Sequence, residues 1–431
     1  MTTRTTVLAA LLIVALALLV LAVLWQPTVT PTASTSGLKV IVVGVDGLDW
    51  FILQKFVAEG RMPFFGHLVG RSVLGSVTAD RPVLPAVGWT QLGNGKLLSE
   101  GALADLAELR GRAVSTSVPG IAEAVVGSGG SCLTIGWPGT WPVEESWDAG
   151  TVIAPYAPDA PAHEVALAPM LYENGSSQAH PAGLSTRIDE AARIISETWP
   201  EEFEEDILPA GEDPEDWSDN VLAARWSYIS DRMTLDLAAG MLAELEPELA
   251  LIHFGGLDAV SHRFVAPGMP EFFPGLSPDA AARYADVLPA YYEFIDSAIR
   301  RIHRLADDRT VFLLCSTYGT HPAEGDILVA GSHERGAPGV FALSGPKITP
   351  VPTPIELSTV DVAPTLLALL GRPIPSDLDG RIVPTATPIG FLQASPPTYT
   401  SSGSREVEAS ACATEEMEAL AAQTIRWLSR N

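Results

Sequence analysis

The chain has 431 residues, of which 47% are hydrophobic, so it can bury a large core and disorder is not expected. Its 52 acidic residues outnumber its 26 basic ones and give a net charge of −26. A surface of this charge repels nucleic acid and anionic lipid headgroups and mainly favours solubility, so we exclude a nucleic-acid-binding function.

The first predicted element is a membrane anchor. Residues 7–25 form an unbroken apolar run of 19 residues. As a helix with a rise of about 1.5 Å per residue, this run matches the hydrocarbon thickness of a bilayer. Cleaved signal peptides have shorter apolar regions of about 7–15 residues and a small-residue cleavage site, which is missing here. We therefore expect residues 1–25 to be an uncleaved anchor, followed by a Thr/Ser/Pro-rich linker at 26–37.

The orientation of this anchor follows from the sparse basic residues around it. Arg4 precedes the apolar run, and the next basic residue is Lys39. This bias predicts a single-pass protein of the cell membrane with the bulk of the chain outside the cytoplasm. If the N-terminal segment were cleaved instead, the protein would be secreted.

Residues 38–390 are predicted to form one α/β domain. Strands alternate there with stretches of helical periodicity, a pattern that indicates a doubly wound, mostly parallel central sheet with helices on both faces. The predicted strands lie within residues 38–50, 131–137, 248–258, 311–319 and 339–348, and predicted helices within residues 231–245, 282–306 and 358–371.

Two segments fit this alternation poorly. Residues 142–228 are rich in Pro, Trp and acidic residues, and we expect them to be a cap inserted over the carboxyl edge of the sheet. Residues 391–431 begin as a Ser/Pro/Thr linker and continue into one amphipathic helix at 414–430.

Polar residues that could carry chemistry occur where predicted strands end. Asp46 follows the first strand in "GVDG", and His333 lies in the Gly-rich loop "GSHERG". Asp258 and His262 in "LDAVSH" are four residues apart, so on a helix they share one face and can reach one divalent cation. Taken singly, these residues could equally be a turn-forming aspartate, a surface pair and an exposed loop histidine.

Six strings that follow one another over residues 38–385 carry a family resemblance. They resemble the type I phosphodiesterase/nucleotide pyrophosphatase branch of the alkaline phosphatase superfamily. The resemblance implies a doubly wound sheet that holds two divalent metals, usually zinc, between which a Ser or Thr oxygen attacks phosphorus. The strings are "VIVVGVDGLDW", "RPVLPAVGWTQLGNGK", "LTIGWPGTWPVEE", "GLDAVSHRF", "SHERGAPGVFALSGPKI" and "VDVAPTLLALLGRPIPSDLDGR".

The resemblance assigns a metal-binding role to four residues. Asp46 matches the family's ligand on the nucleophile side, whereas Asp258, His262 and His333 match three ligands of the other metal. Three protein ligands and a water make a normal catalytic zinc shell. The resemblance therefore implies one divalent metal at Asp258, His262 and His333, with zinc preferred.

The other half of the site departs from the family pattern. Thr317 and Tyr318 stand where the family has an aspartate and a histidine, and both side chains stay protonated at neutral pH. The nucleophile position falls on Pro85, which has no hydroxyl. We expect the second metal site to be absent, with Tyr318 filling the vacated volume and donating a hydrogen bond to Asp46.

Three functions remain open at this point. The first is a membrane-tethered, catalytically degenerate protein that binds a phosphorylated ligand or an envelope protein in the former cleft. The second is an active phosphoric ester hydrolase that uses a relocated nucleophile or a water on a single metal. The third is a purely structural role in an envelope complex, since a fold does not determine a function.

Overall fold

The structure is a computed structural model, and the described part of the chain belongs to the unit formed by residues 33–431. The predicted anchor at 1–25 and the amphipathic helix at 414–430 lie outside the described residues and stay predictions. Within the described ranges, no helix is both long and apolar enough to cross a membrane. The described residues are 36–78, 85–97, 120–138, 140, 150–153, 179–184, 186–188, 190–191, 193–194, 203–204, 206–208, 218–322, 330–333, 338–351, 353–383 and 398–399.

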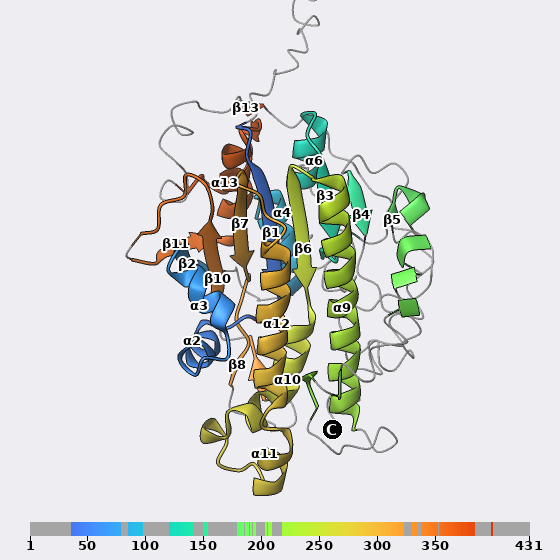
Figure 1. The fold of residues 1–431 in the computed structure, drawn as a ribbon. Coiled ribbons are helices and arrows are strands. Elements are labelled where there is room, and N and C mark those ends of the chain that lie inside the picture. The colour runs from blue at the N-terminus through green and yellow to red at the C-terminus, as the bar shows by residue number, and fades with distance from the viewer. Residues whose placement is uncertain are drawn as a thin grey trace, which may run out of the picture. The chain divides into compact units, whose positions relative to one another are not determined.

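A nine-stranded sheet forms the centre of the domain, in the order β11-β2-β10-β7-β1-β6-β3-β4-β5 (Figure 1). β1 lies in the middle and pairs in parallel with β6 and β7, so that Val43 lies opposite Ile252 and Leu314. The strands are β1 (Lys39–Val45), β2 (Val73–Thr78), β3 (Cys132–Ile135), β4 (Thr151–Ile153), β5 (Ala179–His180), β6 (Leu249–Phe254), β7 (Thr310–Cys315), β10 (Gly339–Ser344) and β11 (Ile355–Ser358).

This sheet confirms the predicted α/β class and shows that the sheet is mixed. β10 runs antiparallel to both β7 and β2, and β5 runs antiparallel to β4, whereas the other neighbours are parallel. Each of the five predicted strands is present. β6 and β7 are buried along their whole length, as expected for strands covered on both faces.

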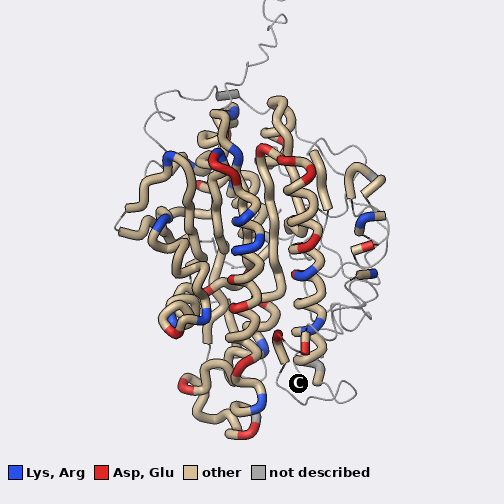
Figure 2. Tube along the Cα trace, viewed as in Figure 1, with Lys and Arg blue, Asp and Glu red and all other residues tan. Residues whose placement is uncertain are grey.

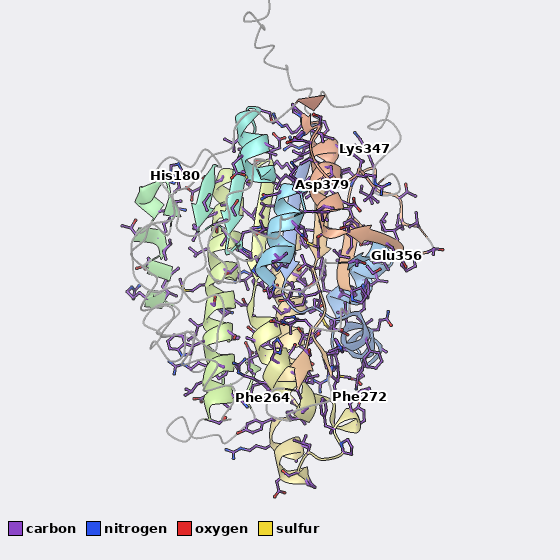
Figure 3. The ribbon with its side chains drawn as sticks, turned by 180° about the vertical axis from the view of Figure 1, so that it is seen from behind. His180, Phe264, Phe272, Lys347, Glu356 and Asp379 are labelled. Carbon is purple, nitrogen blue, oxygen red and sulfur yellow. The ribbon has the colours of Figure 1, made fainter. Side chains whose placement is uncertain are left out.

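Helices cover both faces of the sheet. Successive side chains of β1 point to opposite faces and are apolar on both, so each face needs a covering layer. Val43 packs into one layer and Val42 into the other. Figure 1 shows α9 and α12 in front of the sheet, and Figure 3 shows α4 and α13 behind it. The first layer contains α2 (Trp50–Ala58), α3 (Pro63–Val69), α9 (Asp219–Leu245), α10 (Gly256–Gly268) and α12 (Val287–His303), and the second contains α4 (Pro85–Asn94), α6 (Ile121–Gly127) and α13 (Val362–Leu370).

Some boundaries differ from the prediction. We expected the helical stretch at 282–306 to be interrupted by Pro289. The break lies earlier, between α11 (Pro278–Tyr284) and α12, and Pro289 is in the first turn of α12, where a missing N–H is tolerated. The helix expected at 231–245 begins earlier, at Asp219, because Ser218 caps it by accepting from the Val221 amide.

The range predicted to be a cap, residues 142–228, contributes to the core of the fold in its described parts. β4 and β5 extend the central sheet, and the first turns of α9 pack on its face. The remaining residues of this range lie outside the described part, so a cap over the sheet edge stays a prediction.

Charged residues of both signs are interspersed along the outer helices, as the colouring of α9 and α12 in Figure 2 shows. Arg301 of α12 pairs with Asp236 of α9 at 2.6 Å, but both side chains are partly exposed, so the pair contributes at most about 1 kcal/mol. Three aspartates behave differently because they are buried near the carboxyl ends of strands: Asp46, Asp231 and Asp258. They mark the edge where ligands bind in open α/β sheets.

Candidate metal centre

Three of the predicted ligands lie together at this edge. The carboxylate of Asp258 and the imidazoles of His262 and His333 offer ligand atoms that all lie within 4.8 Å of one another. Asp258 and His262 occupy the first two turns of α10, with 3.5 Å between Oδ2 and Nε2. His333 directly follows β9 (Gly331–Ser332), which pairs with β8 (His321–Pro322).

The two imidazoles have the free nitrogen atoms that a metal needs. Nδ1 of His262 lies 2.7 Å from the carbonyl oxygen of Gly331. Because a carbonyl only accepts, Nδ1 carries the proton and Nε2 is left with its lone pair toward the cluster, as is usual for metal-binding histidines. Nδ1 of His333 is buried and has no hydrogen-bond partner among the described residues, so a ligand or water is needed to satisfy it.

The charges of Asp258 and His262 stabilise each other. Burial would raise the pKa of Asp258, but the neighbouring His262, His333 and Thr320 lower it below its ordinary value. Burial would lower the pKa of His262, but the Asp258 carboxylate raises it. The Thr320 hydroxyl donates to Oδ1 of Asp258 and so orients the carboxylate. One carboxylate and two imidazoles suit zinc, so the donor set fits the predicted metal.

Asp46 is outside this cluster and has other partners. The indole N–H of Trp89, on α4, donates a hydrogen bond to its Oδ1. Nε2 of His253, on β6, lies 3.6 Å from the same oxygen. All three side chains are buried. The carboxylate that the family resemblance assigns to a metal thus accepts a hydrogen bond from a protein side chain.

Aromatic packing fills the volume beside Asp46. The ring of Trp89 meets His253 edge to face with 4.6 Å between centroids, and Trp137 lies 5.1 Å from Trp89. Trp89 fits there because residue 44 is a glycine: a Cβ at Gly44 would lie 2.6 Å from Cη2 of the indole. We did not expect this cluster from the sequence, although Trp89 lies one helical turn beyond Pro85 and His253 is an imidazole within an apolar strand.

Thr317 and Tyr318 are both buried at the end of β7. Neither hydroxyl has a hydrogen-bond partner among the described residues. Burial first, and then the charges of Asp258 and Asp46, raise the pKa of Tyr318 well above its ordinary value, so it stays a neutral phenol. The ring is buried as predicted, and its hydroxyl lies near Asp46 and Asp258, which both contribute to the raised pKa. The hydrogen bond to Oδ1 of Asp46 that has good geometry is donated by Trp89, so donation by Tyr318 stays a prediction.

Pro85 is the first residue of α4 and is half-buried. It lies one helical turn before Trp89, and its assignment to the nucleophile position stays a prediction. Its ring carries no oxygen or sulfur that could attack phosphorus.

Comparison with known proteins gives one family match. Residues 121–332 match the model of the family described as Type I phosphodiesterase / nucleotide pyrophosphatase. This range contains Asp258 and His262 and ends one residue before His333. No curated protein sequence matches the chain.

Solved structures share the fold at low sequence identity. The wild-type alkaline phosphatase PafA aligns over 81% of this chain and 99% of its own, with a TM-score of 0.52 and 10% identity. The phosphonate monoester hydrolase SpPMH from Silicibacter pomeroyi aligns over 81% and 76%, with a TM-score of 0.46 and 15% identity. BT1596, a 2-O GAG sulfatase, aligns over 81% and 74%, with a TM-score of 0.47 and 13% identity. The match to PafA identifies the fold alone.

Proposed function

Because this chain belongs to the type I phosphodiesterase/nucleotide pyrophosphatase family and has the alkaline phosphatase superfamily fold, we propose that it is a catalytically degenerate member. It binds one divalent metal, best fitted by zinc, through Asp258, His262 and His333. It does not transfer a phosphoryl group to a side chain of its own.

The observation that carries this proposal is the hydrogen bond that Asp46 accepts from the indole N–H of Trp89. In a two-metal enzyme of this family, the corresponding carboxylate binds the cation beside the nucleophile. Here its Oδ1 accepts an indole N–H, and the neighbouring Thr317 and Tyr318 are neutral groups that bind zinc poorly. To bind here, a second cation would have to displace the buried indole of Trp89 from Asp46. In return it would obtain a single carboxylate ligand.

The remaining three ligands leave a position open on the metal. A bound zinc ion would supply a Lewis-acidic site for an anionic oxygen. Asp258, His262 and His333 would hold the ion, and Thr320 would keep the Asp258 carboxylate in its orientation. This chemistry supports a phosphorylated ligand, and an envelope protein that presents such a group is the corresponding macromolecular partner.

The proposed location follows from the apolar run at residues 7–25. We place the chain in the cell membrane as a single-pass protein with its bulk outside the cytoplasm. The run's length and the position of Arg4 support this placement.

A second candidate function is an active hydrolase that uses a water on the single metal. The three-ligand set with an open position favours it, because the same arrangement occurs in catalytic zinc sites. Both candidate functions predict one metal per chain, but only the second predicts turnover of a phosphoric ester.

One experiment separates them. The full-length chain is purified, its zinc is counted by elemental analysis, and p-nitrophenyl phosphate mono- and diesters are assayed with added zinc or manganese. We expect one zinc per chain, its loss in Asp258→Ala, and no turnover. The matched control is Asp279→Ala, which removes an exposed carboxylate on α11 and should keep the zinc.

The other outcomes are equally clear. Turnover with one zinc, abolished in Asp258→Ala, would support the single-metal hydrolase and refute degeneracy. Two zinc ions with turnover would refute the claim that the hydrogen bond between Trp89 and Asp46 keeps a second cation out. A chain without bound zinc would refute the metal centre.

A further inference from the structure

We propose that Asp231 is a positioning residue for the metal centre: from α9 it fixes the first turn of α10, so that Asp258 and His262 can meet His333. The inference rests on the proposed metal centre and adds to it a residue that no family motif singled out. Asp231 touches none of the three ligands, so it would act through the backbone of α10.

The contacts of Asp231 converge on one point. Its side chain is buried on α9. Oδ1 accepts from the amide of Gly255 at 3.1 Å, and Oδ2 accepts from the amide of Gly256 at 3.1 Å. The hydroxyl of Tyr291, on α12, donates to Oδ2 at 2.9 Å. One carboxylate therefore joins α9 and α12 to the start of α10.

These contacts replace the cap that α10 lacks. The first amides of a helix have no partner within the helix, and a side chain at the N-cap usually accepts from them. The N-cap of α10 is Gly255, which has no side chain and makes no such bond. Asp231 supplies the acceptor from another helix.

The approach is so close that it depends on a glycine. A Cβ at Gly256 would lie 2.0 Å from Oη of Tyr291 and 2.6 Å from Oδ2 of Asp231. The glycine at this position therefore lets the carboxylate and the phenol reach the backbone two residues before Asp258.

The opposite side of the same turn is held by loops from other strands. The Thr320 hydroxyl donates to Asp258, and the Thr320 amide donates to the carbonyl of Gly47 at 3.0 Å. The first turn of α10 is thus fixed between Asp231 with Tyr291 and the loops after β1 and β7. If Asp231 is removed, one of these two supports is lost, and the ligand carboxylate can move relative to His333. Metal sites depend on such supporting contacts, whose loss commonly lowers affinity about 10- to 100-fold.

The test measures metal binding directly, with the full-length chain. Zinc affinity is obtained by competition with a chromophoric chelator, and the geometry is followed by the visible absorption of the cobalt(II)-loaded protein. Asp231→Ala removes both acceptors, whereas Asp231→Asn keeps a carbonyl oxygen for the two amides. Asp236→Ala is the matched control, because Asp236 lies on the same helix and pairs with Arg301 at the surface.

We expect Asp231→Ala to lose about 10- to 100-fold in zinc affinity and to change the cobalt spectrum. Asp231→Asn should stay within about threefold of the wild type, and Asp236→Ala should not differ from it. Circular dichroism at the assay temperature shows that each variant is folded. A purely structural role would lower the melting temperature and leave the affinity and spectrum of the folded protein unchanged.

An unchanged affinity and spectrum in folded Asp231→Ala would overturn the inference while leaving the metal centre intact. If the wild type itself binds no zinc or cobalt, the metal centre fails, which is a different result. Should Asp231→Ala not fold, Tyr291→Phe decides, because it removes only the hydroxyl that orients Asp231. An affinity and spectrum identical to the wild type in Tyr291→Phe would then refute the proposal, and a weaker affinity with an altered spectrum would support it.

Discussion

The indole N–H of Trp89 donates a hydrogen bond to Oδ1 of Asp46, and both side chains are buried. A carboxylate removed from water is costly unless donors or cations compensate its charge. The indole N–H of Trp89 thus partly compensates the charge of Asp46, which a metal cation would otherwise do. The contact stabilises the apo protein, and this has consequences for variants on both sides of it.

Replacement of Trp89 by phenylalanine keeps an aromatic ring but removes the N–H. Asp46 then lacks its donor, and we expect the free energy of unfolding of the metal-free protein to fall by about 2–3 kcal/mol. Urea denaturation of the wild type and Trp89→Phe measures this change. The double variant Trp89→Phe/Asp46→Asn should recover part of the loss, because an amide is less costly to bury. A loss below about 0.5 kcal/mol in the single variant would show that the contact contributes little.

Replacement of Gly44 by alanine tests the packing of the indole. The new methyl group would lie 2.6 Å from Cη2 of Trp89, which is inside van der Waals contact. Overpacking of a buried strand costs about 1–3 kcal/mol, so we expect a matching decrease in stability on thermal or urea unfolding. Gly70→Ala is the control, since its Cβ would have no neighbour within 4 Å. Equal effects of the two substitutions would contradict the packing explanation.

Restoration of the family ligands at residues 317 and 318 should not restore the second metal. Thr317→Asp together with Tyr318→His supplies a carboxylate and an imidazole, but Trp89 still occupies Oδ1 of Asp46. We expect elemental analysis to find no more zinc per chain than in the wild type. Two zinc ions in this double variant would show that a cation can displace the indole from Asp46. The second metal would then be missing from the wild type only because residues 317 and 318 are not ligands.

The stability of the fold should depend on the protonation of Asp231. Burial raises the pKa of Asp231 to about 7, against hydrogen bonds from Tyr291, Gly256 and Gly255 that lower it, and the charge of Asp46 raises it further. In the unfolded chain an aspartate has a pKa near 3.9. The folded state therefore binds the proton more tightly, and the stability it contributes is lost as the pH rises from about 4 through 7.

Comparison with Asp231→Asn isolates this contribution. Between pH 5 and pH 8, the unfolding free energy of the wild type should fall relative to that of Asp231→Asn, by at most about 3 kcal/mol. Urea denaturation of both proteins across this range measures the difference. Parallel pH profiles would mean that Asp231 ionises in the folded state as readily as in the unfolded chain.

Zinc affinity should rise with pH. Burial would lower the pKa of His262, but Asp258 raises it overall, and zinc must displace the proton that this pKa describes. Below the pKa of His262, each pH unit should therefore change the affinity about tenfold for one displaced proton, with a plateau above it. Competition with a chromophoric chelator between pH 5.5 and pH 8 measures this slope. A flat profile would exclude His262 as a ligand that loses a proton on binding.

The sequence alone predicts much of the fold, because strands such as β6 and β7 are mostly apolar and are separated by stretches of helical periodicity. It also predicts which residues can hold a metal. Asp258 and His262 are four residues apart, so their proximity is a local property of a helix. His333 could be added only by resemblance to a family, since 71 positions separate it from His262.

The sequence by itself therefore determined the α/β class and the family resemblance. The tertiary structure alone decided what compensates Asp46 and what supports Asp258. Trp89, His253 and Asp231 belong to elements distant in the chain, and their partners are set by how α4, α9 and β6 pack at one sheet edge. Such contacts leave no periodic signal, because the burial of a polar group is decided by its neighbours in space.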